Sequence, residues 1–173
     1  MLEWKKLESL LDYEQPSKYI VKSTNYDDSY STPVLTAGQT FILGYTDETE
    51  GVYHADKEHP VLIFDDFMTS FHWVDFDFKV KSSALKILKP KKDVDLRLVY
   101  FLMKEIKYEP KEHSRHWISV YSQFEIPIPS LAEQKRIVGI LDTFTESIEN
   151  LKMQLNERQK QYEYYREKLL TFE

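Results

Sequence analysis

The sequence predicts a mixed α/β (α+β) globular domain, residues 1–129, followed by a long C-terminal α-helix, residues 130–173, that forms an intermolecular coiled coil. Three observations predict this fold class. Short apolar runs bounded by turn residues fill the first part of the chain, a helical period replaces them at residues 94–108, and a heptad spacing of apolar residues extends from residue 137 to residue 169. With 173 residues, 42% of them hydrophobic, the chain can bury one core and carry one appendage.

Short strands are expected in the first half of the domain. The apolar segments TPVLT (32–36) and FILGY (41–45) lie on either side of Gly38, and the polar loop TDETEG ends at Gly51. The continuous apolar run HPVLIFDDF (59–67) is typical of a buried strand. In WVDFDFKVK (73–81) apolar and charged residues alternate, which predicts a strand with one face toward water.

A helix is expected at residues 94–108, where apolar residues recur at helical spacing and Asp95 can serve as the N-cap. Residues 112–129 return to strand-like composition. Pro127 and Pro129 are then expected to end the strand pairing and, with it, the globular domain.

The long helix is expected to start at Ser130, with Glu133 completing a capping box. Because a helix of this length would extend beyond a domain of about 130 residues, we expect a second helix to cover its apolar stripe. Arg158 interrupts the stripe once. The seam residues expected to make the dimer are Ile137, Leu141, Phe144, Ile148, Leu151, Leu155, Tyr162, Tyr165 and Leu169.

Composition narrows the classes of function. The chain has no cysteine, no signal-peptide pattern and no long apolar run, so we expect a cytoplasmic protein that does not enter a membrane. Its four glycines are scattered and its five histidines form no HExxH motif, which argues against a nucleotide-binding loop or a zinc enzyme. We therefore expect neither a metal nor a cofactor in this chain.

Charge is distributed unevenly along the chain. The net charge of -6 is unusual for a DNA-binding protein, but residues 1–60 alone hold 5 Lys or Arg against 11 Asp or Glu. Residues 61–125 hold 11 against 10 and carry many Lys, Ser, Thr, His and Arg side chains. Lys and Ser suit phosphate contacts, whereas Arg and His can reach base edges, so this region is the candidate nucleic-acid surface.

A metal-dependent nuclease is one alternative. Asp65 or Asp66 at the end of an apolar strand, followed by Asp77 and Lys79, imitates the carboxylates and lysine that hold a divalent ion and activate water. The geometry is possible if Asp77 and Lys79 share the wet face of a strand, although this spacing is common by chance.

Several segments together resemble the specificity subunit of type I restriction-modification systems. The combination of an IPIP-x-L-x-x-Q helix start with an RQKQYEYYR tail is specific, and the resemblance covers nearly the whole chain. The segments that carry it are WKKLESLLDYEQPSKYIVKS, TPVLTAGQTFILGYTDETEGVY, HPVLIFDDFMTSFHWVDFDFKVKSSALKIL, HSRHWISVYSQFEIPIPSLAEQKRIVGILDTF and LNERQKQYEYYREKLL.

The resemblance implies a non-catalytic DNA-recognition subunit. A target-recognition domain would read one half of a bipartite site in double-stranded DNA. The long helix would pair with its counterpart as a spacer and as a docking surface for a methyltransferase (modification) subunit, which binds S-adenosylmethionine. A restriction endonuclease subunit is a further implied partner.

This chain departs from the family pattern in having one recognition domain and one long helix where the full subunit has two of each. It resembles a half-subunit, so we expect a homodimer with an inverted-repeat target. A truncated fragment that pairs with other chains without reading DNA is the other alternative. Within the domain, the expected DNA contacts are Gln39, Thr69, Ser70, His72, Lys79, Lys81 and Arg115.

Overall fold

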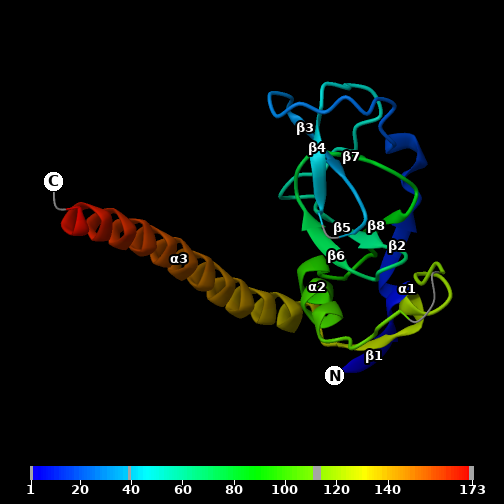
Figure 1. Ribbon diagram of the computed structural model, residues 1–173. Helices are drawn as coiled ribbons and strands as arrows, with labels where there is room; N and C mark the ends of the chain where they lie inside the picture. The colour runs from blue at the N-terminus through cyan, green and yellow to red at the C-terminus, as the bar shows by residue number, and fades with distance from the viewer. Residues whose placement is uncertain (1, 39, 111–113, 172–173) are drawn as a thin grey trace. The chain divides into compact units, whose positions relative to one another are not determined.

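A computed structural model describes residues 2–38, 40–110 and 114–171, and the chain divides into two compact units, Met1–Leu131 and Ala132–Glu173 (Figure 1). The first unit is a mixed α/β domain with three sheets, and the second is a single long helix. The strands are β1 (Glu3–Lys6), β2 (Leu11–Glu14), β3 (Thr32–Leu35), β4 (Ile42–Thr46), β5 (Val61–Asp65), β6 (Phe71–Val74), β7 (Lys79–Val80), β8 (Leu85–Pro90) and β9 (Glu125–Ile128). The helices are α1 (Leu7–Leu10), α2 (Leu96–Lys104) and α3 (Leu131–Leu170), with 3-10 turns η1 (Pro16–Tyr19) and η2 (Tyr121–Gln123).

The central sheet has the strand order β2-β8-β5-β6, and every neighbouring pair is antiparallel. A second sheet has the order β4-β3-β7, in which β3 is antiparallel to β4 and parallel to β7. The third pairs β1 with β9, which lie far apart in the sequence. In Figure 1 the three-stranded sheet and α2 lie on opposite sides of the central sheet.

Both faces of the central sheet are buried. In β5, Leu62 and Phe64 pack in a cluster with α2, whereas Val61 and Ile63 pack in a cluster with Val80 of β7. Successive side chains of a strand point to opposite faces of the sheet, and here an apolar cluster covers each face. The buried strand predicted at residues 59–67 is confirmed as β5, with all five residues buried.

The single half-exposed strand predicted at residues 73–81 is wrong. β6 ends at Val74, and the two-residue β7 belongs to the other sheet. Val74, Phe78 and Val80 are buried as the alternation predicts, but Phe76 is 36% exposed and Lys79 is 1% exposed, the opposite of what it predicts for these two residues. Lys79 is accommodated in the interior because its ammonium lies 2.8 Å from the Glu48 carboxylate.

Residues 112–129 are less extended than their composition suggests. Over the described part of this segment, the chain forms the turn η2 and the short strand β9. Pro127 does not end the pairing as expected, because it lies within β9 opposite Trp4. Proline has no backbone N–H to donate, so it would break a ladder hydrogen bond in the middle of a sheet. An edge position in a two-stranded sheet tolerates it.

Helices are confirmed in both predicted segments, although α2 ends at Lys104, four residues before the predicted end. Asp95 caps α2, accepting hydrogen bonds from the backbone N–H of Arg97 at 2.9 Å and of Leu98 at 3.3 Å. α3 has 40 residues, a length of about 60 Å at 1.5 Å per residue. Within the described ranges, no helix is both long and apolar enough to cross a membrane.

Candidate DNA interface

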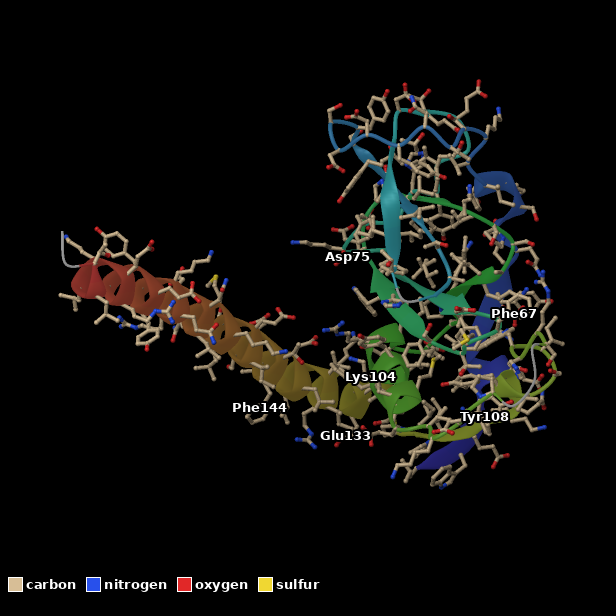
Figure 2. All side chains as sticks on the ribbon, viewed as in Figure 1. Phe67, Asp75, Lys104, Tyr108, Glu133 and Phe144 are labelled. Atoms are coloured by element: carbon tan, nitrogen blue, oxygen red, sulfur yellow. The ribbon has the colours of Figure 1, made fainter. Side chains whose placement is uncertain are left out.

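Several loops meet where strand β5 ends. The Asp66 N–H donates to the Ala84 carbonyl at 2.9 Å, and the Asp66 carbonyl accepts from the His116 N–H at 2.8 Å. The Gly38 N–H donates to the Asp65 carboxylate at 3.2 Å. We call this region the β5-end surface and define it as residues 36–38, 40–41, 66–72, 81–84 and 114–116; Phe67, labelled in Figure 2, belongs to it.

Asp65 shapes the turn from β5 to β6. One oxygen of its carboxylate accepts from the N–H groups of Phe67 at 2.9 Å and Met68 at 3.1 Å. Thr69 adopts a left-handed conformation, with φ 58°, and is buried, so it helps to form the turn. Ser70 is exposed at the end of the same turn. Of the two predicted hydroxyl contacts, only Ser70 faces solvent.

His72 lies at the start of β6, half-buried against an aromatic ring. Its imidazole stacks on Phe41, with ring centroids 3.9 Å apart and planes 17° apart. Burial lowers the pKa of His72, and the Asp65 carboxylate opposes this shift only in part. The ring is therefore neutral near pH 7, a form in which one nitrogen donates and the other accepts a hydrogen bond.

The two predicted lysines lie in different environments. Lys79 is buried, and its ammonium contacts the Glu48 carboxylate at 2.8 Å and the Glu50 carbonyl oxygen at 2.5 Å. Lys81 is half-buried, and its ammonium lies 3.4 Å from the Tyr26 hydroxyl. Lys81 therefore presents a cation near the surface and Lys79 does not. Gln39 lies outside the described residues.

Arg115 is half exposed, and two of its three polar contacts are 3.4 Å long. Its guanidinium donates to the Ser83 carbonyl at 3.1 Å and lies 3.4 Å from the Asp66 carboxylate, with Phe67 beneath it at 5.6 Å. Asp66, Lys86 and Arg115 form a charged cluster, and the sequence pattern did not predict that Asp66 and Lys86 belong with Arg115. Lys86 is 0% exposed in the middle of the sheet, and its ammonium lies 2.9 Å from the Asp66 carboxylate.

A charged residue inside the apolar run LKIL was the available signal for this cluster. Lysine is almost never fully buried without a partner, so Lys86 implied a buried carboxylate nearby. Asp66 and Arg115 could not be assigned to it from the sequence, because 20 or more residues separate each of them from Lys86.

The carboxylates that the nuclease alternative requires each bind a different partner. Asp65 is bonded to its own turn, Asp66 to Lys86, and Asp77 to His54 at 2.8 Å. Among the residues that the structure describes, no three His, Asp or Glu side chains are grouped to hold a metal ion. With Lys79 buried and paired, the geometry that this alternative requires is not formed.

Residues 1–160 match the family model described as the type I restriction modification DNA specificity domain. The chain belongs to this family. The specificity subunit of the type I restriction enzyme EcoR124I/EcoR124II from Escherichia coli is 52% identical over 182 residues, covering 99% of this chain and 45% of the relative. The putative type I restriction enzyme specificity subunit S.HindORF215P from Haemophilus influenzae is 30% identical over 186 residues, covering 99% and 47%. This specificity-family chain thus spans about half the length of the curated relatives it matches.

Solved structures of specificity subunits share the fold. The S subunit of a type I restriction-modification system from M. genitalium superposes with a TM-score of 0.68 at 17% identity, covering 100% of this chain and 46% of that chain. The HsdS subunit from Thermoanaerobacter tengcongensis gives a TM-score of 0.54 at 20% identity, covering 88% and 39%. The family model and the relative at 52% identity confirm the resemblance predicted from sequence segments, and the solved structures add a shared fold.

Proposed function

We propose that this chain reads one half of a bipartite DNA target and acts as a homodimer that directs a methyltransferase subunit to the complete site. The match of residues 1–160 to the specificity family carries the proposal. The chain would take no part in the chemistry, and the methyltransferase would supply S-adenosylmethionine and the transfer of the methyl group. A restriction endonuclease subunit would be a further partner of the same assembly.

Pairing of two copies is supported by the surface of α3. The seam residues from Phe144 onward are exposed in the single chain, an arrangement that is unfavourable for so many large apolar groups. Figure 2 shows Phe144 projecting from the helix. The exposed fractions are 64% for Phe144, 52% for Ile148, 63% for Leu151, 59% for Leu155, 65% for Tyr162, 57% for Tyr165 and 71% for Leu169. With Ile137 and Leu141, these residues would form the dimer contact.

DNA reading is assigned to the β5-end surface. Ser70, Lys81 and Arg115 offer an exposed hydroxyl and two accessible cations, and neutral His72 offers a donor and an acceptor. Thr69 would hold the turn that presents Ser70, and Lys79 would support the loop of Glu48 from inside. Gln39 remains a proposed contact on its chemistry alone, since an amide can pair with adenine in the major groove.

The negative net charge of the chain fits an assembly in which the chain reads the bases and the methyltransferase subunit attracts the DNA phosphates. With a net charge of -6, the chain alone should bind DNA only modestly, and the methyltransferase would contribute much of the attraction to phosphates. A tight complex between the isolated chain and DNA that does not weaken with salt would contradict this account.

Selection from a pool of random duplexes tests the proposed function. The chain, assembled with a modification subunit of this family, should enrich one related set of sequences over repeated rounds. The modification subunit without the chain is the control and should enrich none. Failure of the assembled subunits to enrich any sequence would favour the alternative in which the chain pairs with other subunits without reading DNA.

A further inference from the structure

Two cations share one buried carboxylate at the β5-end surface. The Asp66 carboxylate lies 2.9 Å from the Lys86 ammonium and 3.4 Å from the Arg115 guanidinium. The Asp66 and Lys86 side chains are 2% and 1% exposed, whereas that of Arg115 is 48% exposed. Two positive charges and one negative charge leave one positive charge in excess, and it resides on the group nearest to solvent.

Lys86 by itself can neutralise Asp66. The Lys86–Asp66 contact is the shorter of the two ion pairs, and both of its side chains are shielded from water. A charge in such a buried position needs a close counter-ion. The other Asp66 oxygen accepts the Trp117 N–H at 2.8 Å, and the Asp66 carbonyl accepts the His116 N–H, so the same residue fixes the backbone on the C-terminal side of Arg115.

Arg115 is held only loosely in this cluster. Its contacts with Asp66 and with the Ser83 hydroxyl are both 3.4 Å long, beyond the usual hydrogen-bond range, and only its contact with the Ser83 carbonyl, at 3.1 Å, is of ordinary length. Because the Arg115 side chain is 48% exposed, water screens the attraction between its guanidinium and the buried Asp66 carboxylate. A phosphate can accept two parallel hydrogen bonds from the guanidinium, a bidentate contact that is stronger than these.

We propose that Arg115 contacts a DNA phosphate and that Lys86 is the positioning residue that leaves it free to do so, by serving as the permanent counter-ion of Asp66. This inference rests on the proposed function and refines it, because it assigns Arg115 to the sequence-independent part of DNA binding. Without Lys86, Asp66 would need Arg115 as its only counter-ion, and the guanidinium would be retained by the protein.

The test measures binding of the full chain to a random-sequence duplex by fluorescence anisotropy at several salt concentrations. Removal of one cation that binds a phosphate should reduce the slope of log K against log salt by about 0.9. Arg115→Gln should give this reduction. The matched control is Lys92→Gln, which removes one exposed positive charge just beyond the opposite end of β8 and should leave the slope near that of the wild type.

Lys86→Met should lower the slope as much as Arg115→Gln does, although Arg115 is still present. Asp66→Asn added to Lys86→Met removes the charge that holds Arg115 and should restore the slope. A purely structural role for Lys86 would change the melting temperature but not this pattern of loss and rescue. If Lys86→Met alone does not fold, the double variant is compared with and without Arg115→Gln. Its slope must then equal that of the wild type and fall when Arg115 is replaced.

Different outcomes overturn this inference and the proposed function. Equal slopes for Arg115→Gln and Lys92→Gln, or an unchanged slope in folded Lys86→Met, overturn this inference and leave the proposed function intact. A wild-type chain that binds no duplex even at the lowest salt overturns this inference, whereas the proposed function is overturned only if the assembled subunits enrich no sequence in the selection.

Discussion

Replacing Leu151 by aspartate tests whether the α3 seam pairs two copies of the chain. Leu151 lies mid-seam and is 63% exposed in the single chain. Full burial of a leucine side chain contributes about 1.5–3 kcal/mol, so covering the exposed part in a dimer would contribute about 1–2 kcal/mol per chain. Two chains together would lose about 2–4 kcal/mol of association free energy.

At about 1.4 kcal/mol for each factor of ten, this loss raises the dimer dissociation constant by about 30- to 700-fold. The burial of an unpaired carboxylate adds a further cost, so this range is a lower bound. Light scattering over a series of concentrations measures the effect. The wild type should have a mass near twice 20.7 kDa, and Leu151→Asp should have the mass of a single chain at the same concentration.

Met153→Asp is the matched control. Met153 is 57% exposed and lies two residues along the helix, on nearly the opposite side from Leu151. It should leave the mass of the dimer unchanged. The seam argument is refuted if Leu151→Asp keeps the mass of the wild-type dimer, or if both variants dissociate it equally.

Three further predictions concern the globular domain. Lys79→Ala should lower the free energy of unfolding in urea by about 3 kcal/mol, because Glu48 loses its partner 2.8 Å away, and a loss below about 1 kcal/mol would contradict a structural role for Lys79. Gly51→Ala should destabilise by more than about 1 kcal/mol, since Gly51 has φ 63° and an added Cβ would lie 2.6 Å from a carbonyl oxygen; helical Gly139→Ala, which meets nothing within 4 Å, should stabilise, and equal effects would count against this reading. Burial raises the pKa of Tyr121 from 10.0 to about 12, so the unfolded chain ionises first and the stability from this residue, complete below pH 10, is lost between about pH 10 and 12. Unfolding midpoints at pH 9 and 11 should therefore fall more for the wild type than for Tyr121→Phe, and parallel falls would argue against the shift.

Elements that depend on local patterns were predicted well from the sequence. The α3 helix follows from apolar residues three and four positions apart, and β5 from an uninterrupted apolar run. Asp95 was recognised as a cap because its position before an amphipathic segment determines its role. None of these predictions required knowledge of which distant segments lie together.

Elements that depend on distant partners were missed. β8 forms the middle of the central sheet, but its lysines obscured it, and only the position of Asp66 explains why Lys86 can be buried. Alternation at residues 73–81 suggested that Lys79 faces water, because the pattern does not reveal Glu48 on a separate loop. The same limit applies to the candidate interface, where Arg115 and Ser83 meet across 32 residues of chain.

Mapping of methylated sites in cells tests whether two identical copies of the chain read the DNA target. The chain is produced with a modification subunit of this family in a host that otherwise lacks such methylation, and the modified positions are read across the genome. A homodimer should give one motif made of two identical half-sites in inverted orientation, separated by a spacer of fixed length and no sequence preference. A motif with two different halves, or methylation that does not depend on the chain, would contradict reading by a homodimer.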